Sequence, residues 1–159
     1  MACTLRLVVE RSASMKQALL FSTLLLVTAA CSRSNDVAPT LASEVSGTYL
    51  TNGFLDYLCI ALPPDKMPTA TLMPETDAAV TLTYLTKYPA TKAQTFTHLQ
   101  LKRMADNSIQ LSQQGQVLGT VQPDRAFNAN GMERQALVLR VQTNASDPQT
   151  AITFTGAKE

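Results

Sequence analysis

The sequence predicts an all-β fold, a single antiparallel meander of about seven or eight strands. Short apolar stretches in the later part of the chain alternate with polar residues at the period of two that is typical of half-buried strands. All 6 glycines and all 8 prolines lie beyond residue 31, scattered between these stretches as turn formers are in β domains. The links between stretches are short, and short links make consecutive strands pair antiparallel.

The predicted strands follow one another from residue 47 to the C-terminal end. They cover residues 47–54, 79–88, 95–103, 108–113 and 116–122, then the stretches around 137–141 and 152–154, and residues 69–73 as an edge strand. The side chains expected to face inward are Val80, Leu82, Tyr84, Leu99, Leu101, Ile109, Leu111, Val117, Val121, Leu137, Leu139, Val141, Ile152 and Phe154. Phe96 and His98 are expected on the opposite face from Leu99 and Leu101.

Turn residues separate several of these strands. Asp106-Asn107, Gln114-Gly115 and residues 144–149 are short and rich in turn formers, whereas residues 123–135 form the longest late gap and are expected to be a loop around Asn130-Gly131. Seven or eight strands close most economically into a small barrel or curl into a half barrel, because closure removes exposed strand edges.

Composition and charge limit the classes of partner. The chain has 159 residues, of which 45% are apolar and 16% charged, enough for one domain with a single core. Lysine and arginine total 13 against 12 aspartate and glutamate, and no run of like charge occurs, so a nucleic-acid partner is not expected.

The N-terminal part has the layout of a secretory signal. From Met15, Lys16 is followed by an apolar core and then by small residues before Cys31. The apolar stretch 18–30 would form a helix of only about 20 Å, short of the roughly 30 Å hydrocarbon layer, so cleavage is favoured over a permanent span. We expect translation to start at Met15; a start at Met1 would only lengthen the region before the apolar core.

Thr28-Ala29-Ala30-Cys31 resembles the lipobox of bacterial lipoproteins, with Thr28 where leucine is usual. The resemblance implies cleavage between Ala30 and Cys31 and acylation of the Cys31 thiol, which would anchor the protein in the bacterial cell envelope through its acyl chains. Ser32, rather than aspartate, follows the cysteine, and by the sorting rule of such lipoproteins this implies the outer membrane. The alternatives are an ordinary secretory signal with an incidental Cys31, or an uncleaved anchor.

The expected organisation has three parts. Residues 1–30 are the signal peptide, residues 31–43 a lipidated polar tether and residues 44–159 the β domain. The mature part would be close to neutral, so attachment would depend on acyl chains rather than on a polybasic patch.

The three cysteines have different expected fates. Cys3 lies in the discarded segment, Cys31 is acylated, and Cys59 between Leu58 and Ile60 is left unpaired and packed in the core. Without lipidation, a disulfide between Cys31 and Cys59 becomes an alternative.

No catalytic set, metal site or cofactor can be assigned. His98 is the only histidine and is expected to face solvent. The acidic residues fall mainly in expected loops: Asp56, Asp65, Glu75, Asp77, Asp106, Asp124, Glu133 and Asp147. The four tyrosines either complete the core or line the mouth of a pocket: Tyr49, Tyr57, Tyr84 and Tyr88.

Gly47-Thr48-Tyr49 at the first strand resembles the start of lipocalins and related calycins, with Tyr49 in place of their tryptophan. We therefore expect a non-catalytic envelope domain that binds a small apolar or envelope ligand, or another envelope protein. A ligand role predicts a continuous cavity along the barrel axis, and a solid interior with an apolar patch would favour a protein contact. The alternative is an envelope hydrolase that uses loop carboxylates.

Overall fold

The computed structural model describes residues 38–143 and 151–159. The expected signal peptide, the cleavage site at Ala30 and the lipidation site Cys31 lie outside the described residues, as does the turn expected at 144–149. The described part of the tether does not match the expectation, because a helix, α2 (Leu41–Val45), begins within it and buries Ala42. The compact unit accordingly starts at Pro39.

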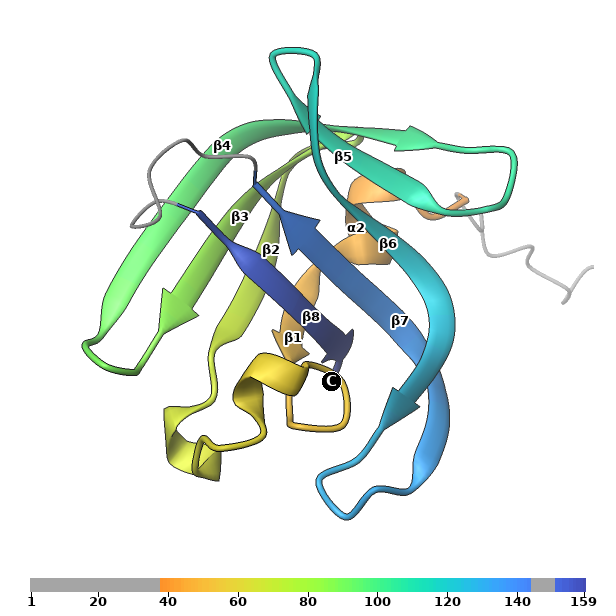
Figure 1. The fold of residues 1–159 in the computed structure, drawn as a ribbon. Helices are drawn as coiled ribbons and strands as arrows, with labels where there is room; N and C mark the ends of the chain where they lie inside the picture. Colours follow the sequence, from red (N-terminus) through yellow and green to blue (C-terminus); the bar gives the residue numbers. More distant parts are fainter. Residues whose placement is uncertain (1–37, 144–150) are drawn as a thin grey trace, which may run out of the picture. The chain divides into compact units, whose positions relative to one another are not determined.

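The domain is a closed antiparallel barrel of eight strands, which confirms the predicted all-β meander (Figure 1). Each strand pairs with the next along the chain, and β8 closes on β1 through the pairs Tyr49–Lys158 and Leu50–Ala157. The strands are β1 (Gly47–Leu50), β2 (Thr69–Thr76), β3 (Ala79–Thr86), β4 (Lys92–Arg103), β5 (Ile109–Gln113), β6 (Gln116–Phe127), β7 (Glu133–Gln142) and β8 (Thr153–Lys158).

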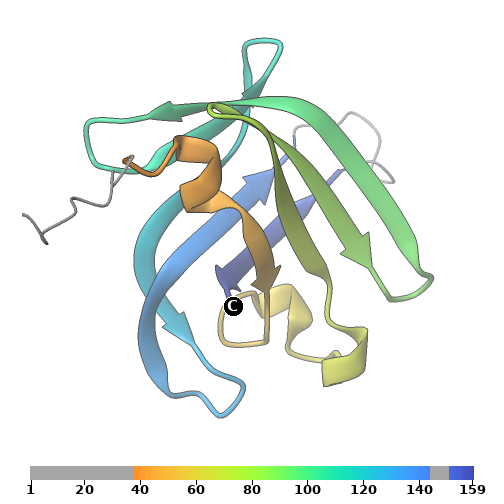
Figure 2. The ribbon, with the colours of Figure 1, turned by 180° about the vertical axis from the view of Figure 1, so that it is seen from behind.

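Two non-strand elements lie at opposite ends of β1. α2 precedes the strand, and residues 51–68, hereafter the β1–β2 segment, follow it (Figures 1 and 2). The segment contains two short 3-10 helices, η1 (Tyr57–Cys59) and η2 (Pro64–Lys66). The barrel therefore has an α2 end and a β1–β2 end.

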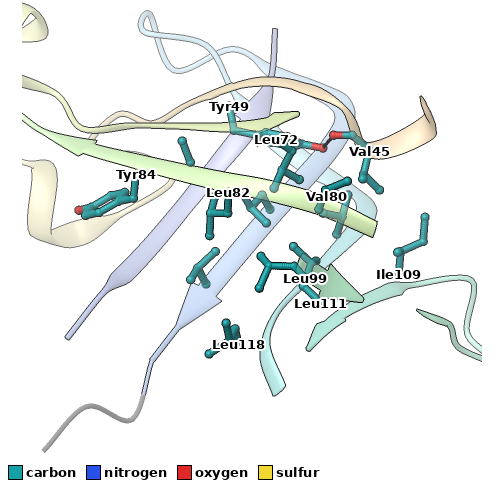
Figure 3. Close-up of a cluster of buried hydrophobic side chains, with 14 of the residues drawn as sticks. Val45, Tyr49, Leu72, Val80, Leu82, Tyr84, Leu99, Ile109, Leu111 and Leu118 are labelled. Atoms are coloured by element: carbon teal, nitrogen blue, oxygen red, sulfur yellow. Dashed lines mark hydrogen bonds between the residues drawn. The ribbon is translucent and has the colours of Figure 1, made fainter. Parts of the chain in front are cut away.

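The interior of the barrel is filled by the alternating apolar side chains of its strands (Figure 3). Tyr49, Leu72, Val80, Leu99 and Phe154 are among the largest fully buried side chains. At the β1–β2 end of this core, the ring of Tyr84 packs edge-on against Phe154, with their centroids 5.6 Å apart. Aromatic pairs prefer this geometry, which adds to the stabilisation from their burial.

A β-bulge in β4 changes which side chains face inward. Val80 pairs with Leu99 but Leu82 pairs with Phe96, so Thr97 and His98 together oppose a single residue of β3. The extra residue reverses the alternation, and Phe96 packs against the interior core, which makes its predicted outward placement wrong. His98 has a φ of 56° and remains outside the barrel, as predicted.

A second bulge shifts β6. Leu111 pairs with Gly119 and Ser112 with Val117, so Leu118 is the extra residue. Leu118 turns into the core while Val117 is 48% exposed. The predicted inward placement of Val117 is therefore wrong, and that of Val121 is confirmed.

Two strand boundaries and the pairing of one strand also differ from the predictions. β1 ends at Leu50, because the side chain of Asn52 accepts hydrogen bonds from the backbone N–H groups of Phe54 and Leu55 and turns the chain. β2 is not an edge strand, since it pairs with both β1 and β3. Residues 123–127 are strand rather than loop, and only the turn at Asn130-Gly131 separates β6 from β7.

Candidate functional site: the β1–β2 end of the barrel

The β1–β2 segment is held across the end of the barrel by a few specific contacts. Asn52 Nδ2 donates to the backbone oxygen of Phe127 in β6 at 2.7 Å, which ties the segment to the β6–β7 hairpin. A Cβ atom at Gly53 would lie 2.9 Å from Ile60 Cα, so glycine lets the segment fold closely on itself. Asp56 caps η1 by accepting from the backbone N–H of Leu58 at 3.0 Å.

Buried polar groups gather under this segment. Cys59 is 3% exposed and unpaired, as predicted, and burial raises the pKa of its thiol, with a further rise from the charge of Asp56. Burial likewise raises the pKa of Tyr84 to about 12, with smaller contributions from Cys59 and Asp56. A thiol whose pKa is raised is less often ionised to the nucleophilic thiolate, which disfavours a nucleophilic role for Cys59.

Thr51 is the polar residue of this cluster that lacks a hydrogen bond. It is 7% exposed, and its Oγ1 has no hydrogen-bond partner among the described residues. Its hydroxyl adjoins the thiol of Cys59 and opposes the rise in that pKa, but the contact lacks hydrogen-bond geometry. An unsatisfied buried hydroxyl costs stability, on the order of 1 to 3 kcal/mol.

The outer surface of the segment is strongly apolar. Phe54, Tyr57, Leu58 and Ile60 are 61%, 76%, 55% and 71% exposed, respectively. Their side chains belong to one short stretch of chain, whereas exposed hydrophobic residues on monomeric proteins are usually scattered. A local concentration of this kind is typical of a surface that binds something.

A pocket of about 270 Å³ lies beside this surface. Most of its lining comes from the β1–β2 segment, and Leu50, Thr69, Lys87 and Ala129 complete it from β1, β2 and the two neighbouring turns. The lining is mainly apolar, and Lys87 is its one charged residue. None of the lining residues belongs to the interior core. This pocket is therefore not the continuous axial cavity that a ligand role predicts from the sequence.

A second concavity, of about 410 Å³, lies over β6, β7 and β8. Its lining is more polar, and its charged residue Arg140 already pairs with Asp124 through an Nη2–Oδ2 contact of 2.5 Å. The cation there is neutralised within the domain, whereas Lys87 has no ion pair or hydrogen bond with another described residue.

Three of the acidic residues considered from the sequence lie on strands rather than in loops. Glu75 belongs to β2, Asp124 to β6 and Glu133 to β7. Hydrogen bonds from Thr81 and then from the His98 backbone lower the pKa of Glu75. Hydrogen bonds from Ser108 lower the pKa of Asp106. Hydrogen bonds from Arg140 and the Arg125 backbone lower the pKa of Asp124. Among residues 38–143 and 151–159, no group of three or more histidine, cysteine or acidic side chains could hold a metal ion.

The single histidine and two of the four tyrosines lie on the surface, and the other two tyrosines lie in the core. His98 is exposed, and its Nδ1 lies 2.6 Å from Glu75 Oε2. Tyr49 and Tyr84 are buried in the core, while Tyr57 and Tyr88 are exposed. Tyr49 and Tyr84 therefore complete the core, whereas Tyr57 and Tyr88 line neither of the two concavities described above.

The pocket is not among the features predicted from the sequence. The apolar stretch Phe54-Leu55-Asp56-Tyr57-Leu58-Cys59-Ile60 is its sequence signal, but apolar character alone does not distinguish a pocket wall from a core segment. No helix in the part of the chain that the structure describes is long and apolar enough to cross a membrane. Comparisons with protein-family models, with curated proteins and with solved structures find no match for this chain.

Proposed function

We propose that this protein is a lipid-anchored bacterial cell-envelope protein, held in the outer membrane by acyl chains on Cys31, whose barrel is a non-catalytic domain that binds a small apolar ligand. The observation that carries the ligand role is the apolar pocket at the β1–β2 end, next to four exposed apolar side chains. Ligand pockets are usually concave and mostly apolar with few polar groups, and this one has that character.

The position of α2 fits this proposal. The chain enters the domain through α2, which lies at the other end of β1 from the β1–β2 segment (Figure 2), and that segment supplies most of the pocket lining. An anchor at Cys31 would therefore join the domain through α2 rather than through the segment that lines the pocket.

Metabolic labelling with a fatty-acid probe tests the anchor. Cys31→Ala should abolish the label, because the acylated atom is its sulfur, while Cys3→Ala and Cys59→Ala should keep it. The two controls remove the other cysteines of the chain in the same way. Label that persists in Cys31→Ala, or a mature N-terminus at another residue, would overturn the anchor.

Photolabelling tests the ligand role. A photoreactive neutral aliphatic alcohol is added to the full-length protein in membranes, and labelling of residues 50–69 is measured by mass spectrometry. Met67→Glu, which places a charge in the lining, should reduce the labelling about tenfold, equivalent to about 1.4 kcal/mol. Met73→Glu is the matched control, because Met73 is exposed on β2 away from the pocket. Equal labelling of both variants and the wild type would contradict ligand binding here.

A protein contact at the same end is the second candidate, and it meets the criterion stated from the sequence, because the barrel interior is filled and an apolar patch lies outside it. Tyr57, Leu58 and Ile60 are exposed but do not line the pocket, and aromatic and aliphatic side chains of this kind often anchor interfaces. Tyr57→Ser with Ile60→Ser should weaken cross-linking to one defined envelope protein while pocket labelling is retained. Loss of the cross-link in this variant, with pocket labelling unchanged, would favour the protein contact over the small ligand.

The hydrolase alternative finds less support in the site. A general acid for glycoside hydrolysis needs a carboxyl with a raised pKa, whereas the pKa values of Glu75, Asp106 and Asp124 are lowered. A turnover of envelope polymer that is abolished by alanine at one of the described acidic residues would revive it.

A further inference from the structure

We propose that the pocket at the β1–β2 end takes a small aliphatic carboxylate, with the carboxylate against Lys87 and the aliphatic chain along the apolar lining. This inference rests on the proposed ligand role and names the class of ligand. It starts from the charge of the pocket, the partners of its polar groups and its size.

Lys87 supplies an uncompensated positive charge. It follows β3 directly, at the start of the turn to β4, and it is half-buried at the pocket. No described carboxylate lies within ion-pair distance of its Nζ, although Glu44, Asp124 and Glu133 each contact an arginine elsewhere. A partly desolvated ammonium without a partner favours an anionic ligand and disfavours a cationic one.

The other polar side chains of the lining are neutral: Thr51, Asn52 and Thr69. Asn52 already donates one hydrogen bond from its nitrogen to Phe127, and its oxygen accepts from Phe54 and Leu55. The Thr51 hydroxyl is buried and carries no charge, so Lys87 alone supplies a charge to the lining. One lysine and no arginine at the pocket suit a single negative charge. A phosphate group usually requires several donors, such as arginine side chains or a row of backbone N–H groups.

The remainder of the lining suits an aliphatic chain. Leu50, Phe54, Met67, Pro64, Pro68 and Ala129 contribute apolar surface. The volume of about 270 Å³ is just below the roughly 300 to 1,000 Å³ of typical ligand pockets, so a short or medium chain fits better than a long acyl chain or a sterol. Burial of each methylene contributes about 0.8 kcal/mol, so the chain supplies affinity and Lys87 supplies selectivity.

The test compares three photoreactive probes with the same chain: an octanoate, an octanol and an octylamine analogue. They are applied to the full-length protein in membranes, and labelling of residues 50–69 is quantified. We expect the octanoate analogue to bind about tenfold more tightly than the alcohol, the ratio that about 1.4 kcal/mol gives, and the amine to bind most weakly. High salt should reduce the difference between octanoate and octanol.

Three variants isolate Lys87. Lys87→Gln should lower octanoate binding to the level of octanol, and Lys87→Arg, which keeps the charge, should retain the preference. Lys102→Gln, an exposed lysine of β4 that does not line the pocket, is the matched control and should behave like the wild type. Thermal unfolding of each variant checks that it is folded.

The outcomes separate the two proposals. Equal binding of octanoate and octanol, unchanged in Lys87→Gln, overturns the carboxylate inference but leaves an apolar-ligand pocket. Absence of labelling by all three probes overturns both. A preference for octanoate that persists in Lys87→Gln would also overturn the role of Lys87.

Discussion

The two ends of the barrel satisfy their polar groups to different degrees. At the α2 end, Ala42 N donates to Asp77 O at 3.1 Å and Tyr49 OH donates to Val45 O at 2.7 Å (Figure 3). Glu44 joins α2 to the barrel twice, through an ion pair with Arg103 and through its backbone oxygen, which accepts from Lys158 Nζ. These contacts pair backbone and side-chain groups of α2 with the barrel, and Ala42 and Val45 are buried.

The β1–β2 end has the opposite character. Phe54, Tyr57, Leu58 and Ile60 are exposed, the Thr51 hydroxyl is buried without a hydrogen bond, and Lys87 has no described partner. Exposed apolar surface and unsatisfied polar groups both cost stability. Proteins tend to retain such costs at functional sites, and the contrast therefore supports the binding role proposed above for the β1–β2 end.

The largest expected effect comes from the tyrosines of the two ends. Tyr49→Ala should lower the free energy of unfolding by about 3 to 5 kcal/mol, because Tyr49 is fully buried and its hydroxyl bonds Val45. Tyr57→Ala removes a side chain of the same kind that is largely exposed, and should change it by less than about 0.5 kcal/mol. Urea unfolding measures both. A similar loss in the two variants would remove the contrast between the ends.

The regular strands were predictable because their alternation is local. Val80, Leu82 and Tyr84 of β3 are buried as the period of two requires. The bulges were not predictable, since an extra residue in β4 or β6 leaves no mark in the hydrophobic pattern and yet reverses it for Phe96 and Val117. Short turns at Asp106-Asn107 and Gln114-Gly115 were found because turn formers act locally.

The pocket could not be predicted from the sequence in the same way. Lys87 and Ala129 reach it from turns that are distant in sequence from the β1–β2 segment. Their proximity depends on closure of the barrel and on the path of residues 51–68, which turn at Asn52 instead of continuing β1. Only the apolar character of residues 54–60 was visible beforehand.

The pH dependence of stability gives the next largest effect. Burial raises the pKa of Tyr84 from its ordinary value of 10.0 to about 12, so the folded state holds this proton more tightly than the unfolded chain does. The contribution of this proton to the free energy of unfolding is therefore fully present below pH 10 and is lost as the pH rises towards 12. The loss is roughly 2 to 3 kcal/mol, at 1.36 kcal/mol per pKa unit. Burial raises the pKa of Tyr49 as well, so ionisation of Tyr49 at the α2 end also lowers the stability of the domain at alkaline pH.

Tyr84→Phe isolates the contribution of the β1–β2 end. Unfolding curves at a series of alkaline pH values should show a smaller loss of stability in Tyr84→Phe than in the wild type. Tyr49→Phe measures the contribution of the α2 end in the same way, although it also removes the bond to Val45. Parallel pH profiles of Tyr84→Phe and the wild type would show that the ionisation of Tyr84 is not coupled to folding.

The smallest effect is the sharpest test of the contrast. The same substitution, threonine to valine, should lower the free energy of unfolding at the α2 end and should not lower it at the β1–β2 end. Thr40→Val removes the side-chain oxygen that caps α2 by accepting from Ser43 N at 3.2 Å, and should destabilise the domain by about 1 kcal/mol. Thr51→Val replaces a buried hydroxyl that has no hydrogen bond with a methyl group of similar shape, and should leave stability unchanged or raise it by up to about 1 kcal/mol. Both changes are measured by urea unfolding at neutral pH. If Thr51→Val costs as much as Thr40→Val, the Thr51 hydroxyl has a partner in solution, and the β1–β2 end is as fully satisfied as the α2 end.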